Sequence, residues 1–158
     1  MYNFKDGNGL VPAHQHSNGG GWVADSANVA ETCYIGPNAL VYGNAKLHDT
    51  VSVIDTAEVY GDVELYDKVI VKNTSKIYGN AKIYDRVVIE NASKVYDSSE
   101  LFDDVNVTGT SKIYNNTKMY NTSKTEKNAD IFGDSKIHDD AVIGITISNK
   151  KFIGKEEK

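Results

Sequence analysis

Apolar side chains recur at every sixth position from Val23 to Ile143, and this period constrains the fold more than any other feature of the chain. Of the 21 positions in the series, only Thr125 carries a polar side chain. A small or slim side chain lies two residues before each of them, as at Cys33 and Ala39. A strict repeat over most of a chain predicts a solenoid, in which each unit stacks on its neighbours.

The period of six fits short strands separated by turns. It matches neither the 3.6-residue period of a helix nor the two-residue period of a long strand. Because side chains alternate along a strand, a short strand points the apolar residue inward and its two neighbours outward. The first turn position is rich in residues that tolerate left-handed backbone: Gly43, Asp49, Asp55, Gly61, Asp67, Asn73, Gly79 and Asp85.

Three such units per revolution give a coil of 18 residues with three walls. The residue after each apolar position tests this arrangement, because a step of 18 sorts these residues into columns. One column is aromatic throughout and contains Tyr42, Tyr60, Tyr78, Tyr96, Tyr114 and Phe132. The next contains His48, Tyr66, Tyr84, Phe102, Tyr120 and His138. The pattern predicts an all-β fold, a single-stranded parallel β-helix shaped as a triangular prism of about seven coils.

The period also sets the expected boundaries. We expect an N-terminal cap at 1–22, a β-helix of 21 hexapeptide repeats at 23–143, and a C-terminal cap strand with a frayed tail at 144–158. Caps are needed because open strand edges invite association. Inside the repeat, 121–128 is polar around its core threonine, and we expect a local loosening or a bulged turn there.

Charge and cysteine content narrow the partners and the compartment. The net charge of −5 predicts no basic surface, so we expect neither nucleic acid nor a membrane as a partner. No apolar run approaches the ~20 residues that a membrane-spanning helix needs. The single cysteine, Cys33, has no partner for an internal disulfide, which fits a reducing compartment. We therefore predict a cytoplasmic protein.

Residues 23–143 resemble the hexapeptide-repeat superfamily, whose members form left-handed parallel β-helices. The resemblance is carried by segments such as Val-Tyr-Gly-Asn-Ala at 41–45 and Ile-Tyr-Gly-Asn-Ala at 77–81. These repeats and the segment 12–23 look like uncharacterised bacterial and prophage proteins of that superfamily. The left hand is implied by the resemblance alone, since parallel crossovers are otherwise right-handed in most cases.

The resemblance leaves two functions open. Many members are trimeric acyltransferases that use an acyl-CoA donor, and by that resemblance His48 or His138 would be the general base. Those enzymes carry a loop that interrupts the coils, whereas no coil of this chain is interrupted. The preferred prediction is therefore a non-catalytic binding or scaffold protein, of a prophage-type accessory or inhibitory kind, without a cofactor.

The aromatic columns are the candidate binding surface. In-register aromatic pairs stabilise a sheet, so the columns can be purely structural. Exposed tyrosine also suits binding surfaces, because it is large, rigid and half polar. On the second reading a sugar, a base or a protein partner would bind through Tyr42, Tyr60, Tyr78, Tyr96, Tyr114, Tyr66, Tyr84 and Tyr120.

The third face carries apolar outward positions. Ile54, Ile70 and Val88 fall on successive coils of that face. A contiguous apolar patch on a small protein typically marks an interface. We expect this face to form a homo-oligomer, a dimer or a trimer, with a few scattered exposed aliphatic residues as the alternative.

Two weaker candidates for a metal site remain. His14 and His16 share one side of an extended segment, although packing of the cap would also explain them. Asp67 and Asp85 belong to a column of turn carboxylates, whose mutual repulsion can recruit a cation. Turn formation by aspartate is the alternative explanation for that column.

Overall fold

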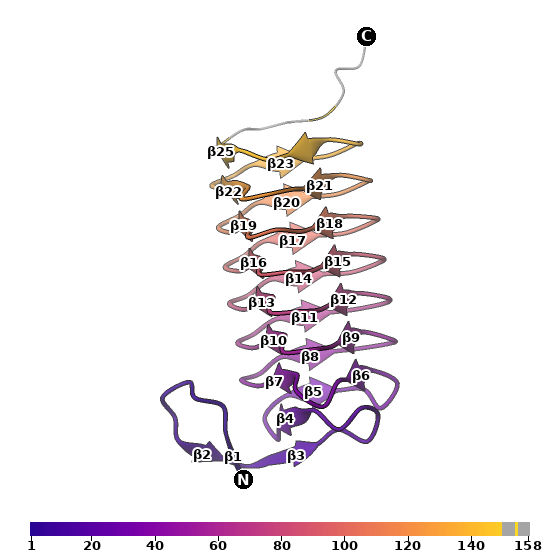
Figure 1. The fold of residues 1–158 in the computed structure, drawn as a ribbon, viewed down its shortest axis with the longest axis vertical. Coiled ribbons are helices and arrows are strands. Elements are labelled where there is room, and N and C mark those ends of the chain that lie inside the picture. Colours follow the sequence, from indigo (N-terminus) through magenta and orange to yellow (C-terminus); the bar gives the residue numbers. More distant parts are fainter. Residues whose placement is uncertain (150–153, 155–158) are drawn as a thin grey trace.

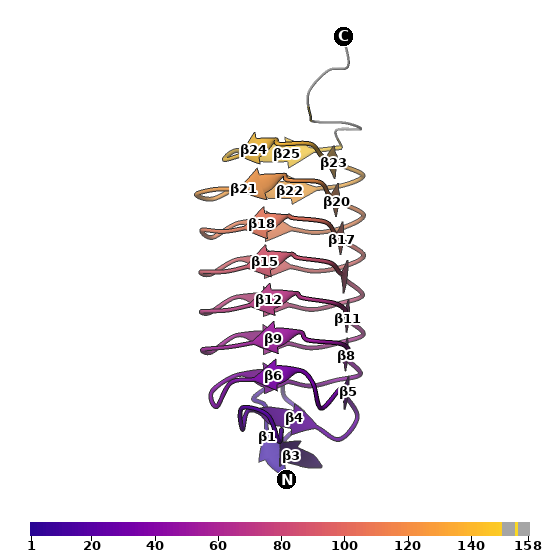
Figure 2. The same cartoon turned by 90° about the vertical axis from the view of Figure 1, so that its right-hand side faces the viewer.

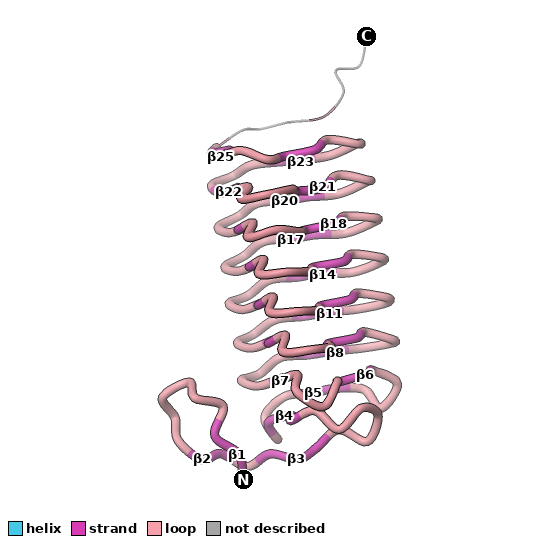
Figure 3. Tube along the Cα trace, in the orientation of Figure 1, coloured by secondary structure: helices cyan, strands magenta, loops and turns pink. Residues whose placement is uncertain are grey.

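The chain coils into a tall solenoid of short parallel strands joined by turns (Figure 1). The computed structural model describes residues 1–149 and 154. These residues contain 25 strands and no helix. Figure 3 shows the chain coloured as strands and loops throughout the described part. None of them belongs to a helix long and apolar enough to cross a membrane. The predicted all-β solenoid of about seven coils is confirmed.

Three parallel sheets form the walls of the solenoid, and Figure 2 faces the third of them. Sheet 1 contains β4 (Trp22–Ala24), β7 (Leu40–Val41), β10 (Glu58–Val59), β13 (Lys76–Ile77), β16 (Lys94–Val95), β19 (Lys112–Ile113), β22 (Asp130–Phe132) and β25 (Thr146–Ser148). Sheet 2 contains β5 (Asn28–Val29), β8 (Lys46–Leu47), β11 (Glu64–Leu65), β14 (Lys82–Ile83), β17 (Glu100–Leu101), β20 (Lys118–Met119) and β23 (Lys136–Ile137). Sheet 3 contains β6 (Tyr34–Ile35), β9 (Ser52–Val53), β12 (Ile70–Val71), β15 (Val88–Ile89), β18 (Asn106–Val107), β21 (Lys124–Thr125) and β24 (Val142–Ile143).

The register follows the 18-residue period. Val59 pairs with Ile77, and the same step relates paired residues of sheets 2 and 3. Only the last coil departs from it: Ile131 pairs with Ile147, a step of 16 residues. The period therefore runs through Ile143, and the final coil is two residues shorter than the others.

The turns adopt the left-handed backbone that the composition predicts. All eight Gly, Asn and Asp residues named for the first turn position have φ between +54° and +82°. Gly43 shows why one of these columns favours glycine. A Cβ there would lie 2.7 Å from the backbone nitrogen of Gly61, in the turn directly above.

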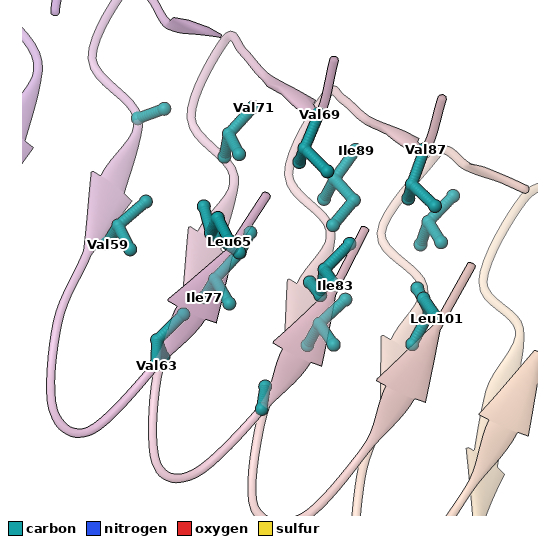
Figure 4. Packing of buried hydrophobic residues seen from close by; sticks show 14 of the residues in the cluster. Val59, Val63, Leu65, Val69, Val71, Ile77, Ile83, Val87, Ile89 and Leu101 are labelled. Atoms are coloured by element: carbon teal, nitrogen blue, oxygen red, sulfur yellow. The ribbon is translucent and has the colours of Figure 1, made fainter. Parts of the chain in front are cut away.

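One apolar core fills the inside of the prism. The inward residues of all three sheets meet there, as the close view of Val59, Leu65 and Ile89 illustrates (Figure 4). Each of these side chains is fully buried. Burial of one such side chain stabilises the fold by about 1.5–3 kcal/mol, so the stack rests on a long series of similar contributions. Cys33 is a buried member of this core.

Hydroxyl groups enter the core only in the upper part of the solenoid. From β13 upward most of the small inward positions hold buried Ser or Thr, with Ala or Val at the others, whereas below β13 buried Cys, Ala and Val occupy them. Most of these hydroxyls donate to the carbonyl three residues earlier, as Ser75 does to Lys72 at 2.6 Å. The residues concerned are Ser75, Ser93, Ser99, Ser111, Thr117, Ser123 and Ser135.

The irregularity expected at 121–128 is seen at one of the backbone hydrogen bonds that join neighbouring strands of sheet 3. The N–H of Glu90 donates to the backbone carbonyl of Val107, as the coils require. One coil higher, the N–H of Thr108 donates instead to the side-chain hydroxyl of Thr125, at 3.0 Å. The β18–β21 register is correspondingly reduced to the pair Asn106 and Lys124. The coil continues, but it is held less regularly here.

The N-terminal segment closes the lower end. β3 (Ala13–Gln15) pairs antiparallel with β4. The loop between β3 and β4 forms backbone hydrogen bonds with the first coil, such as the one that the Gly21 N–H donates to the Ile35 carbonyl at 2.9 Å. β1 (Tyr2–Asn3) and β2 (Leu10–Val11) form an antiparallel hairpin beside the base of sheet 1 (Figure 1). At the other end, β25 is the strand expected after Ile143, while the tail predicted to fray lies mostly outside the described residues.

Candidate ligand-binding surface on the first sheet

The first aromatic column forms an unbroken ladder on the outer face of sheet 1. From Tyr42 to Phe132, neighbouring rings are nearly parallel, and their centroids lie 4.7–5.1 Å apart. The N-terminal hairpin extends the ladder downward. Phe4 stacks on Tyr42 at 4.8 Å, and Tyr2 stacks on Trp22 at 4.5 Å. The ladder therefore joins the hairpin to six successive coils.

Ring geometry determines what this ladder offers to a ligand. Parallel rings at this separation must overlap as offset stacks, because coplanar rings would collide. The ring faces lie largely against one another, and the ladder presents ring edges and hydroxyl groups. Burial raises the pKa of Tyr60 and Tyr78, and it raises the pKa of Tyr96 to about 12. These hydroxyls consequently stay protonated at neutral pH and can donate hydrogen bonds.

A groove separates the hairpin from the lower part of the ladder. Its volume is about 630 Å³. Aromatic and polar side chains line it together, which is the usual composition of a site that orients a small or elongated ligand. The lining residues are Tyr2, Asn3, Phe4, Lys5, Asp6, Leu40, Tyr42, Glu58, Tyr60 and Lys76.

The Glu58 carboxylate is fixed from two sides at the floor of this groove. It accepts a hydrogen bond from the Tyr42 hydroxyl at 3.0 Å and another from the Lys76 ammonium at 2.8 Å. Tyr42 is 7% exposed, and burial together with the Glu58 charge raises the pKa of its hydroxyl strongly. The groove thus has a preformed polar floor whose groups are already oriented.

The second aromatic column, on sheet 2, is interrupted. His48 stacks on Tyr66 at 4.9 Å, and a separate stack begins at Tyr84 and ends at His138. No ring stack joins Tyr66 to Tyr84 in the described structure. The hydroxyl of Tyr66 donates to Glu64 of its own coil. This bond turns the Tyr66 ring away from the position in which it would stack on Tyr84. Tyr84 donates to a glutamate one coil above, Glu100.

Charges on sheet 2 compensate one another. Lysine and glutamate alternate along its outward strand positions from Lys46 to Lys118, and the structure pairs Lys46 with Glu64 at 3.1 Å and Lys118 with Glu100 at 2.5 Å. Above them, Lys118 and Lys136 are register partners. The two lysine–glutamate bonds, with those from the two tyrosines, lower the pKa of both glutamates. The aromatic and charged columns of sheet 2 mainly satisfy each other.

The two histidines proposed as general bases lie at opposite ends of the second column. His48 is half-buried against Tyr66, and His138 stacks on Tyr120 at 5.3 Å with its Nδ1 2.9 Å from Asp139. The structure does not bring them together, so each would have to act alone. Neither lines the groove on sheet 1.

Sheet 3 brings two of the three predicted interface residues together. Ile70 and Val88 are direct register partners on neighbouring strands, whereas Ile54 follows β9 on the coil below. All three are half-buried. Self-association through this face stays a prediction.

The turn aspartates form a hydrogen-bonded ladder of their own. The carboxylate of Asp67 accepts the backbone N–H of Asp85, one coil above, at 3.3 Å, and Asp85 does the same for Asp103 at 3.0 Å. Each carboxylate therefore satisfies a turn amide, which is the structural explanation of this column. A groove of about 310 Å³ runs along it, where Lys68 and Arg86 add positive charge.

His14 and His16, the histidines of the predicted metal site, are each bonded to other groups. His14 lies on β3 and pairs with Asp25 at 2.8 Å. His16 is buried, and its two ring nitrogens bond to the backbone of Asn18 and Ala30. In the described residues, no three His, Cys, Asp or Glu side chains gather as a metal site would require.

Sequence reasoning missed the contribution of the hairpin. Tyr2 and Phe4 stand two residues apart, which places them on one side of an extended segment, but nothing in the repeat indicates which wall they cover. Comparison of the chain with family models, curated proteins and solved structures found no match. The resemblance to the hexapeptide-repeat superfamily and the left hand of the coil stay predictions.

Proposed function

We propose that this chain is a non-catalytic binding protein whose sheet 1 holds an elongated polar ligand, a chain of sugar units. The ligand lies in the groove under the N-terminal hairpin and continues upward along the aromatic ladder. The observation that carries the proposal is the groove of about 630 Å³ opening onto an unbroken ladder of six aromatic rings.

The composition of the groove supports a sugar chain. Sugars present hydroxyl groups around an apolar ring, and they are bound by donors and acceptors set among aromatic side chains. Glu58 and Lys76 supply fixed polar groups on the sheet, and Asn3 and Asp6 supply others on the hairpin. Because the ladder repeats the same group at each coil, it suits a ligand that is itself a repeat.

The proposal also includes the sequence-based predictions on compartment, self-association and cofactor, which rest on the sequence alone. The protein acts in the cytoplasm as a homo-oligomer assembled through sheet 3, and it uses no cofactor. The setting suggested by the resemblance is that of a prophage-type accessory or inhibitory protein, in which the sugar-binding wall, or a protein partner bound there, carries the activity.

An array of neutral and acidic oligosaccharides tests the proposal. We expect the protein to bind at least one oligosaccharide on it, and Tyr60→Ser with Tyr78→Ser to remove that binding. The matched control is Tyr84→Ser with Tyr120→Ser, which alters the same residue type on sheet 2 and leaves binding intact. Binding to no sugar, or equal loss in both double variants, would overturn the proposal.

The acyltransferase alternative is tested separately. That alternative places an acyl-CoA donor between subunits. If the protein is the non-catalytic binding protein proposed here, acetyl-CoA and longer acyl-CoA donors should leave the melting temperature unchanged. A rise in melting temperature that grows with acyl-CoA concentration, and that His48→Ala or His138→Ala removes, would establish donor binding and favour the enzyme.

A further inference from the structure

Three lysines stand directly above one another on the outer face of sheet 1. Lys76 is the register partner of Lys94, and Lys94 is the register partner of Lys112. Like charges directly opposite on neighbouring strands destabilise a sheet. This column therefore costs stability, whereas the part of the sheet 2 column from Lys46 to Lys118 gains stability from alternating lysine and glutamate.

Lys94, the middle one of the three lysines, has no acidic neighbour in the column, because its register partners are Lys76 and Lys112. Lys76 pairs with Glu58 at 2.8 Å. Lys94 and Lys112 are exposed, and neither makes an ion pair or a side-chain hydrogen bond within the described residues. Asp130 is the register partner above Lys112 and places a negative charge on that side of it, whereas Lys94 lies between two lysines.

Lys94 lies where the proposed ligand would pass. Lys76 lines the groove, and Lys94 is the next outward residue on the coil above it. Each lysine precedes a ladder tyrosine by two residues, as Lys94 precedes Tyr96, so ammonium and hydroxyl project from the same face. A sequence that keeps a local conflict of this kind without compensation typically does so at a functional site.

We infer that the ligand is an acidic oligosaccharide, and that Lys94 and Lys112 bind carboxylates on neighbouring sugar units. This inference rests on the proposed function and names the class of sugar. Adjacent coils are ~4.8 Å apart, so Lys94 and Lys112 lie one strand spacing from each other along the ladder on which the ligand is proposed to lie.

Charge reversal at Lys94 gives a test that does not depend on a destabilised variant. In Lys94→Glu, the new carboxylate lies between Lys76 and Lys112, so we expect a higher melting temperature. The probe is a hexamer of galacturonic acid, followed by isothermal titration calorimetry, with a neutral glucose hexamer beside it. We expect the variant to lose at least about tenfold in affinity for the acidic hexamer, since a hydrogen bond to a charged group is replaced by repulsion.

The matched control is Lys82→Glu on sheet 2. It changes the net charge by the same amount, but it places a third glutamate in register between Glu64 and Glu100. It should therefore lower the melting temperature and leave the affinity for the acidic hexamer unchanged. Equal weakening in both variants would show a long-range charge effect and overturn the inference. A glutamate hexapeptide bound as tightly as the acidic sugar would also overturn it.

The outcomes separate this inference from the proposed function. Binding of the neutral hexamer alone, removed by Tyr60→Ser with Tyr78→Ser, would leave the proposed function in place and overturn the acidic ligand. If neither hexamer binds and no sugar on the array binds, both the inference and the proposed function are overturned.

Discussion

The lower and upper coils share one backbone but differ in the inward side chains at their bends. Below β13 these side chains are Cys33, Ala39, Ala45, Val51, Ala57, Val63 and Val69, all fully buried and apolar. From Ser75 upward, most are serine or threonine. Both halves otherwise follow the same 18-residue register with apolar inward residues on the strands, except at Thr125 and in the shortened last coil.

The difference shows that the fold tolerates polar groups at the bends when each finds its own partner. A buried hydroxyl without a hydrogen bond costs free energy, whereas a bonded one is nearly neutral. In a solenoid each coil contacts mainly its neighbours, so stability is close to a sum of local terms. We expect the upper coils, where apolar burial at the bends is smaller, to open before the lower ones.

Matched truncations of the core test this expectation most strongly. Leu65 and Met119 are both fully buried in sheet 2, one in each half. Leu65→Ala and Met119→Ala should each lower the free energy of unfolding by about 2–5 kcal/mol. In Met119→Ala the upper coils should unfold first, giving two steps in urea unfolding followed by circular dichroism. A single coincident transition in both variants would mean that the halves are not energetically distinct.

Two serines of the upper coils should respond in opposite directions. Ser99 donates to the carbonyl of Tyr96 at 2.7 Å, whereas the buried hydroxyl of Ser123 has no partner in the described structure. Ser123→Ala should therefore raise the free energy of unfolding by about 1–3 kcal/mol, and Ser99→Ala should lower it by about 1 kcal/mol. Urea unfolding measures both. Destabilisation by Ser123→Ala would show that its hydroxyl is satisfied.

The irregular ladder bond offers a smaller effect. In Thr125→Val the hydroxyl that accepts the Thr108 N–H is gone, and this N–H can bond to a backbone carbonyl as in the coils below. The added apolar methyl and the restored bond should raise the free energy of unfolding by about 0.5–1 kcal/mol. Hydrogen exchange at Thr108 should slow accordingly; faster exchange would show that the hydroxyl is the better partner.

Substitution of glutamates on sheet 2 should change stability least, and by the same amount in the lower and upper halves. A hydrogen bond from Tyr66, then one from Lys46, lowers the pKa of Glu64 below its ordinary value of 4.5, and Lys118 with Tyr84 does so for Glu100. Because the native pKa values are lowered, the stabilisation is present above 4.5 and is lost as the pH falls through the native values.

Glu64→Gln and Glu100→Gln should each cost about 0.2–1 kcal/mol at pH 7, and this cost should shrink as the pH falls below the ordinary glutamate value. Thermal unfolding from pH 7 down to pH 3 measures it. A cost that is unchanged at pH 3 would assign the effect to packing instead of charge.

Much of the fold could be predicted because the repeat is local. Val41, Val59 and Ile77 lie in stacked strands of one sheet, as the step of 18 requires, and the aromatic columns follow from the same step. The weak point at Thr125 was predictable as well, since a polar side chain breaks the series. The short last coil was not, because the chain leaves the period where nothing further fixes the register.

The candidate site was less predictable than the fold. The periodicity assigns a residue to a wall but not its side-chain torsions, so the interruption between Tyr66 and Tyr84 depends on hydrogen bonds to glutamates that the pattern does not rank. The hairpin lies outside the repeat, and its packing against Tyr42 is a tertiary contact with no periodic signal. The groove is lined by both the hairpin and the repeat, so the repeat alone does not predict it.

The uniform step of the walls has a consequence for how such a molecule can change in length. Duplicating or deleting one full turn of the spiral leaves every later side chain on the wall it already occupies. An insertion of six residues keeps each apolar group inside but moves everything after it one wall onward, so Tyr78 would leave the ladder for the neighbouring face. Size and surface pattern can therefore vary independently, provided that growth comes in whole turns.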